Sequence, residues 1–204
     1  MYTKEIYEID DIIKLFKSKL DIDELKDRLI KNPLNEGKGA SRTGESEERQ
    51  YISTVPELNF IHANDIISND PNVHLASYNQ YEGDIIYCED KEALTDMATL
   101  KEANTINFDI KISSRAPLVE ENSPYPKWFV GCITKDSLKG FGAPNHFYLS
   151  FSKNCDTCVI GDSYLIKRDI QHSQLHYKYT KSNEPFITFN QMTEGVHWKY
   201  LYKR

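Results

Sequence analysis

The sequence predicts a mixed α/β or α+β domain in which helices come first and a sheet follows. The length of 204 residues suits one domain. The 39% of hydrophobic and 27% of charged residues are typical of a globular protein with a buried core. Apolar residues recur at helical spacing before about residue 70, and short apolar or alternating runs follow it. We therefore expect a single domain over residues 1–204, with a mainly helical part at 1–70 and a sheet-rich part at 71–204.

Four helical segments are expected in the first part. Ile9, Ile12 and Phe16 recur three or four residues apart, which predicts an amphipathic helix. Asp21 is a suitable cap for a second helix, which should end before Asn32-Pro33. A glycine-containing basic stretch at 35–44 leads into an acidic helical segment that starts at Glu45. Thr54 and Pro56 suit the start of a further helix through about Ile67.

The second part contains short apolar or alternating runs separated by turn residues, which predict strands. The expected strands cover residues 73–76, 84–88, 105–113, 127–134, 146–152, 164–168 and 185–190 and the tyrosine-rich end, with a short helix inserted at 90–103.

Charge is distributed unevenly along the chain. Residues 1–110 carry 12 basic and 23 acidic residues, whereas residues 111–204 carry 13 basic and 8 acidic ones. Such asymmetry indicates a surface in the second half that faces a polyanion, or simply two solvated faces of different charge. No apolar run approaches the length of a membrane span, and the first residues lack the apolar core of a signal peptide. The expected location is cytoplasmic, without a membrane partner.

The four cysteines include one closely spaced pair, Cys155 and Cys158. No second pair of cysteines or histidines follows at zinc-finger distance. Reduced structural thiols are therefore expected. A zinc site is the alternative, and it would need Cys88, Cys132 or a histidine brought close by the fold.

The segment at 105–113 carries the most chemical information. Its alternation places Ile106, Phe108 and Ile110 on one face of a strand, with Asp109 and Lys111 on the other. Four acid-x-Lys tripeptides occur in the chain, and only this one lies on a convincing amphipathic strand. A second acid, Asp84, opens the short strand predicted upstream. The alternative is that Asp109 and Lys111 form a solvated pair on an exposed sheet.

These residues resemble the PD-(D/E)xK nuclease superfamily, and type II restriction endonucleases in particular. In that family an acid at the start of one strand and an acid-x-Lys on the next converge at a sheet edge. The stretch from Gly39 to Glu45 is similar to the basic, glycine-containing element that leads into a helix bearing a glutamate. The resemblance implies a restriction-endonuclease-like mixed central sheet flanked by helices. Gly83 stands where the family name has proline, and the proline-rich residues 114–126 follow where the family usually continues into a helix.

The resemblance also implies a catalytic role for four residues. Asp84 and Asp109 would hold Mg²⁺, whose preferred ligands are carboxylate oxygens. Lys111 would orient or help deprotonate the attacking water and offset phosphate charge. Glu45 would be an outer or supporting ligand. No serine nucleophile elbow, phosphate-binding loop or dinucleotide fingerprint is present in the sequence.

Double-stranded DNA is the expected partner, contacted mainly by the more basic half of the chain. Side chains able to grip phosphates or read base edges are candidates. These candidates are Arg115, Lys139, Asn145, Gln171, Gln174, Lys178, Lys181 and Asn183. A symmetric DNA site would imply a homodimer, formed through the acidic N-terminal helices.

Three other functions remain open. A structure-specific repair or junction nuclease of the same superfamily is the first alternative, and only its dependence on substrate structure would separate it from a site-specific enzyme. A non-catalytic binding or regulatory protein would show no metal dependence. A thiol or zinc protein would use Cys155 and Cys158. His62 lies in apolar surroundings and is interpreted as a core or surface residue rather than a ligand, and His146 has no acid or nucleophile at a telling distance in the sequence.

Overall fold

A computed structural model of the chain shows how these segments fold. The structure describes residues 4–34, 43–66, 83–95, 99–100, 103–112, 129–132, 144–179, 181, 183, 185–188 and 191–203. The expected strand at 73–76 lies outside these residues.

Helices come first along the chain, as the sequence predicts. The described helices are α1 (Ile9–Lys19), α2 (Ile22–Lys31), α3 (Thr43–Thr54) and α7 (Ser163–Gln171), with short 3₁₀ segments η1 (Ala63–Asp65) and η2 (Glu92–Thr95). The cap at Asp21 is confirmed, because its carboxylate accepts hydrogen bonds from the backbone N–H groups of Asp23 and Glu24. None of the helices in this part of the chain is long and apolar enough to cross a membrane.

A six-stranded mixed sheet forms the centre of the molecule, in the order β1-β2-β3-β5-β6-β9. Its strands are β1 (Phe60–His62), β2 (Ile85–Cys88), β3 (Thr105–Ile112), β5 (His146–Phe151), β6 (Cys158–Asp162) and β9 (Trp198–Tyr202). Neighbouring strands are antiparallel except β3 and β5, which run parallel. A smaller sheet has the order β4-β8-β7, from β4 (Phe129–Cys132), β8 (Pro185–Thr188) and β7 (Lys178–Tyr179). The predicted mixed α/β class is therefore confirmed.

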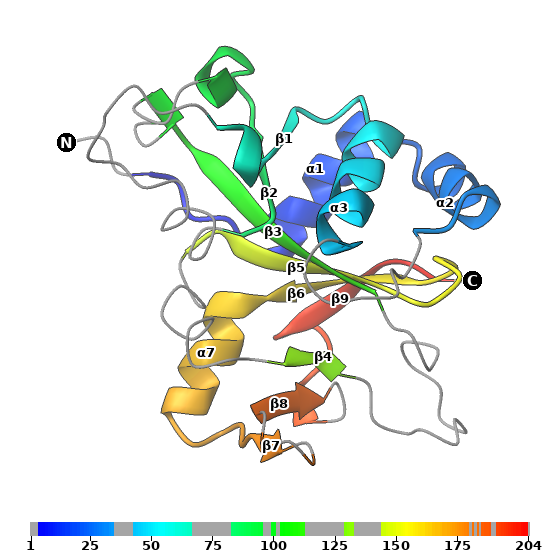
Figure 1. Cartoon of the computed structure of the whole chain (residues 1–204). Coiled ribbons are helices and arrows are strands. Elements are labelled where there is room, and N and C mark those ends of the chain that lie inside the picture. The colour runs from blue at the N-terminus through cyan, green and yellow to red at the C-terminus, as the bar shows by residue number, and fades with distance from the viewer. Residues whose placement is uncertain are drawn as a thin grey trace.

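Helices α1, α2 and α3 cover one face of the main sheet (Figure 1). Phe16 of α1 and Tyr51 of α3 are fully buried there, in one cluster with Phe108 of β3 and Phe147 of β5. The rings of Phe16 and Phe108 meet edge to face, with centroids 5.9 Å apart. Such aromatic contacts stabilise a core beyond the area that they bury. This cluster uses the apolar side of β3 that the alternation predicted.

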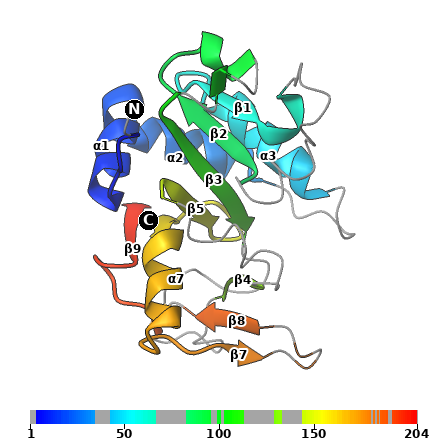
Figure 2. The ribbon, with the colours of Figure 1, turned by 90° about the vertical axis from the view of Figure 1, so that its left-hand side faces the viewer.

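Helix α7 and the smaller sheet lie on the opposite face (Figure 2). Ile166 of α7 and Ile187 of β8 pack in a second cluster with Tyr148 of β5 and Trp198 of β9. Tyr148 is the register partner of Asp109 in the parallel pair β3–β5. Because register partners point to the same side of a sheet, α7 and the smaller sheet lie on the face that carries Asp109.

The helix expected from residue 54 to about 67 is wrong. Helix α3 ends at Thr54, and residues 60–62 form the edge strand β1 instead. Phe60 pairs with Tyr87 of β2, and its ring meets that of Phe108 edge to face. Pairing with β2 and packing of this partly buried ring against the core therefore override the local helix signals, a tertiary effect that one segment cannot reveal.

The strand expected at 164–168 is also wrong, because these residues belong to α7. Asp162 ends β6 and caps the helix, with its Oδ1 accepting the N–H of Leu165. Ile166 is fully buried and Ile170 packs beside it, four residues further on. A short apolar run fits a helix and a strand equally well. The strand missed in this region is β6, five buried residues that directly precede the helix.

Candidate active site

Asp84 directly precedes β2 and lies beside β3 in the main sheet. Its backbone N–H donates to the carbonyl of Phe108 at 2.9 Å, and Ile85 and Phe108 are register partners. Gly83 precedes it with a φ of +100°, and a Cβ there would lie 3.1 Å from the Phe108 carbonyl oxygen. Proline cannot adopt this φ, which explains why glycine stands at this position.

The structure brings together the three residues that the acid-x-Lys pattern singled out. The Asp84 carboxylate accepts the backbone N–H of Ile110 through Oδ2, at 3.0 Å. Lys111 Nζ lies 3.8 Å from the same oxygen. Asp109 directly precedes Ile110 in the chain, and its negative charge raises the pKa of Asp84. Two acids and one amine therefore converge where β2 begins and β3 ends.

Burial and mutual repulsion set the ionisation of this group. Burial, and then the charge of Asp109, raise the pKa of Asp84 to about 7, although Lys111 opposes them. Burial also raises the pKa of Asp109, but the positive charge of Lys111 and the contact with His146 outweigh it and the net pKa is lowered. Burial lowers the pKa of Lys111, and the surrounding carboxylates, first that of Asp109, outweigh it and raise the net pKa. Near neutral pH the site thus holds an ionised Asp109, a charged Lys111 and an Asp84 that readily takes a proton.

Among the glutamates of helix α3, Glu48 rather than Glu45 acts electrostatically on the candidate site. The negative charge of Glu48 raises the pKa of both Asp84 and Lys111. Glu45 instead accepts a hydrogen bond from Arg49 at 2.9 Å, and Arg49 also binds Asp65. Glu48 lies three residues before the fully buried Tyr51, so helical periodicity was the signal that could have identified it.

His146 is a site residue that the sequence reasoning missed. Its Nε2 lies 3.2 Å from Asp109 Oδ2, and its side chain is 5% exposed. The contact depends on the parallel pairing of β3 with β5, in which His146 is the partner of Asn107. These strands are far apart in the sequence, so local reasoning gives no signal for the contact.

Further buried polar atoms line the same side of β3 and β5. Asn107 Oδ1, Ser150 Oγ and both ring nitrogens of His146 have no hydrogen-bond partner of good geometry within the described part of the chain. Buried polar atoms without a partner are uncommon in native proteins and often bind water or a ligand. The strip beside Asp109 is therefore polar as well as buried.

The donor set fits Mg²⁺ through two carboxylates. Among the described residues no group of three or more His, Cys, Asp or Glu side chains is arranged to hold a metal ion. Mg²⁺ commonly keeps several waters and takes one or two carboxylates from the protein. Burial first, and then the negative charge of Asp109, raise the pKa of Asp84, and a bound cation would offset the repulsion between the two carboxylates. Asp84 and Asp109 are the residues that could hold it.

Cys155 and Cys158 lie in the main core instead. Both are buried free thiols, in the cluster that includes Tyr51. Burial raises the pKa of each thiol, which reduces its reactivity as a nucleophile. Their environment is that of structural thiols, as expected from the sequence.

The eight candidate DNA-contact residues occupy different places. Arg115 and Lys139 lie outside the described residues. Asn145 is buried, and its amide binds the N-terminal segment, accepting the N–H of Tyr7 at 2.8 Å and donating to the carbonyl of Glu5 at 2.7 Å. This amide is thus occupied by the protein itself.

The other five candidates gather around the end of α7 and the smaller sheet (Figure 1). Gln171 ends α7, and Gln174 follows it. Lys178 lies on β7, and Lys181 and Asn183 lie between β7 and β8. All five side chains are exposed except that of Lys178, which is half-buried. This part of the molecule packs on the face that carries Asp109, and in Figure 2 the arrow of β3 ends above the smaller sheet.

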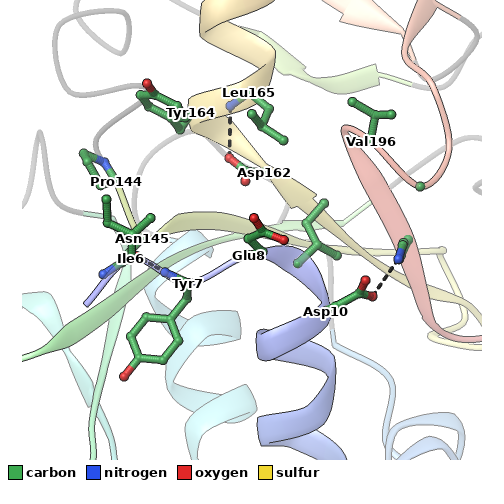
Figure 3. Close-up of a pocket in the computed structure, with 13 residues that line it drawn as sticks. Ile6, Tyr7, Glu8, Asp10, Pro144, Asn145, Asp162, Tyr164, Leu165 and Val196 are labelled. Carbon is green, nitrogen blue, oxygen red and sulfur yellow. Dashed lines mark hydrogen bonds and ion pairs between the residues drawn. The ribbon is translucent and has the colours of Figure 1, made fainter. Parts of the chain in front are cut away.

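A cavity of about 370 Å³ lies between the N-terminal segment, the start of α7 and residues 195–199 (Figure 3). Asp162, which caps α7, contributes to its lining, and Lys199 binds Asp10 at 2.6 Å beside it. Neither Asp84, Asp109 nor Lys111 lines this cavity. The cavity is therefore distinct from the carboxylate site.

Comparison of the chain with family models, with curated proteins and with solved structures found no match. The candidate site therefore rests on the structure alone: Lys111 Nζ lies 3.8 Å from Asp84 Oδ2, and the charges of Asp109 and Glu48 act on the pKa of both residues.

Proposed function

We propose that the protein is a Mg²⁺-dependent endonuclease that hydrolyses phosphodiester bonds in double-stranded DNA, of the type II restriction enzyme kind. One observation carries the proposal: Asp84, Asp109 and Lys111, which resemble the PD-(D/E)xK pattern, meet on adjacent strands, with Lys111 Nζ 3.8 Å from Asp84 Oδ2. The antiparallel pairing of β2 with β3, beside helices on one face, supports a restriction-endonuclease-like fold.

Each residue has a separate task in this proposal. Asp84 and Asp109 would hold the ion, which when bound supplies a Lewis acid and a more acidic water. Lys111 stays protonated at neutral pH because the neighbouring carboxylates raise its pKa, so its ammonium suits orienting a water and offsetting phosphate charge better than removing a proton. His146 lies against Asp109 and keeps that carboxylate in place.

DNA would approach from the side of α7 and the smaller sheet. Gln171, Gln174 and Lys181 are exposed there, on the same face of the main sheet as Asp109. Binding to a symmetric site would require a homodimer, and light scattering with and without DNA would test this. A protein that stays monomeric in both conditions would contradict the dimer.

The test of the function is incubation of the purified protein with mixed plasmid and phage DNA, in Mg²⁺ and in EDTA. Discrete fragments that require Mg²⁺ support a site-specific enzyme. Cleavage confined to branched or damaged substrates would point to a repair or junction nuclease. Binding without cleavage of any of these DNAs would favour a non-catalytic protein.

The assignment of Glu48 gives a first prediction. Glu48→Gln removes a negative charge that acts on Asp84 and Lys111, so we expect Mg²⁺-dependent cleavage to fall about 10- to 100-fold. Glu45→Gln removes only an exposed pair with Arg49, and cleavage should change less than about threefold. Initial cleavage rates of both variants at one Mg²⁺ concentration measure the difference. Equal losses in the two variants would contradict the assignment.

A further inference from the structure

We propose that His62 is a positioning residue that holds Glu48 in the active site. The inference rests on the proposed nuclease function and adds to it a residue outside the acid-x-Lys pattern. His62 ends β1, and its side chain is 3% exposed. Its Nε2 lies 2.7 Å from Glu48 Oε2.

The hydrogen bonds of His62 indicate which of its ring nitrogens faces a donor and which faces an acceptor. Its Nδ1 accepts the backbone N–H of Asn64 at 3.1 Å, so Nδ1 carries no proton. The ring proton therefore lies on Nε2 and is donated to Glu48. An imidazole with both ring nitrogens hydrogen-bonded fixes the orientation of its carboxylate partner, as in the outer shell of metal sites.

The segment that contains His62 also holds Asp84. The next residue, Ala63, donates its backbone N–H to the carbonyl of Asp84 at 3.0 Å. Asp65, two residues further, binds Arg49 of α3 through both of its oxygens, at 2.7 and 2.8 Å. Residues 62–65 thus connect α3 to the start of β2, and they set the position of Glu48 relative to Asp84.

The chain contains a matched control for this arrangement. His197 is 6% exposed at its side chain, its Nδ1 accepts the N–H of Thr193 at 3.0 Å, and its Nε2 lies 2.6 Å from Asp169 Oδ2. Asp169 is paired with Arg168 and has no described effect on the pKa of Asp84. Loss of this histidine should therefore affect stability but not the site.

Two substitutions separate the two hydrogen bonds of His62. His62→Asn keeps an oxygen that can accept the N–H of Asn64 but cannot reach Glu48. His62→Gln keeps an amide N–H that can reach Glu48. Two Mg²⁺ midpoints are measured. The first is the Mg²⁺ concentration that gives half of the maximal rise in melting temperature, in the presence of the metal alone. The second is the Mg²⁺ concentration that gives half-maximal DNA cleavage.

We expect His62→Asn to raise both Mg²⁺ midpoints about 10- to 100-fold, and His62→Gln to restore them to within about threefold of wild type. His197→Asn should lower the melting temperature and leave both midpoints unchanged. In a Glu48→Gln background, His62→Asn should have no further effect, because it acts through that carboxylate.

The positioning role is overturned if His62→Asn keeps the wild-type midpoints, or if His197→Asn shifts them equally. It is also overturned if His62→Asn and Glu48→Gln act additively. A wild-type protein that neither binds Mg²⁺ nor cleaves DNA overturns the proposed function itself, and the inference with it. The metal titration on the wild type thus separates the two failures.

Discussion

Asp109→Asn and Lys111→Met are each expected to reduce Mg²⁺-dependent DNA cleavage by about 10³-fold, which corresponds to ~4 kcal/mol of transition-state stabilisation. Asp109→Asn removes the negative charge that raises the pKa of Lys111, on a carboxylate whose Oδ2 lies 3.2 Å from His146 Nε2. Lys111→Met removes the ammonium next to Asp84 but keeps a side chain of similar length. Single-turnover cleavage with excess enzyme measures the chemical step apart from DNA binding.

The second helix offers a control with the same tripeptide pattern. Glu24 and Lys26 form an acid-x-Lys on α2, where their partners are Arg28 and Asp23 at the surface. Glu24→Gln and Lys26→Met should leave cleavage near the wild-type rate. Cleavage that survives both Asp109→Asn and Lys111→Met would show that the reaction takes place elsewhere on the chain.

Asp84→Asn is expected to stabilise the metal-free protein at pH 8 by about 1–2 kcal/mol. The pKa of Asp84 rises from 3.8 to about 7 on folding, so the folded state binds its proton more tightly than the unfolded state. Ionisation of Asp84 therefore destabilises the fold as pH rises from about 4 to about 7, and no further loss follows above that. The full shift would correspond to ~4 kcal/mol, and we expect less because the side chain is 28% exposed.

Urea unfolding in EDTA at pH 4.5 and pH 8 tests this sign. The free energy of unfolding of Asp84→Asn should exceed that of the wild type by more at pH 8 than at pH 4.5. Added Mg²⁺ should reverse this difference, because it stabilises the wild type alone. Asp109→Asn is the contrasting variant. In the wild type, Lys111 and His146 outweigh the effect of burial and lower the pKa of Asp109, so the ionised carboxylate stabilises the fold. Asp109→Asn removes this carboxylate and should therefore lower the free energy of unfolding at pH 8. A stabilised Asp109→Asn, or an unstable Asp84→Asn, would contradict these assignments.

Part of the candidate site could be predicted because it lies on one strand. The alternation of β3 places Asp109 and Lys111 side by side with no knowledge of the rest of the chain. Asp84 was identified because an acid opens the short apolar run of β2. Glu45 was chosen from the resemblance, and the choice between it and Glu48 depended on how α3 is rotated against the sheet.

The two histidines could not be found from the sequence. His146 reaches Asp109 only because β5 is parallel to β3, and His62 reaches Glu48 only because β1 pairs with the edge of β2. Both contacts require strand pairings between distant segments. The same pairings explain why residues 60–62 form a strand, against their local helix signals.

The sequence by itself determined the class of the fold, the helices α1 to α3, the strand β3 and the acid-lysine pair on its polar side. These features depend on short-range periodicity and capping, which operate within a few residues. Only the tertiary structure decided the order of the strands, the helical state of residues 163–171 and the partners of Asp84, Asp109 and Glu48. The physical reason is that burial and strand register are properties of distant segments in contact, and they outweigh the weaker local propensities.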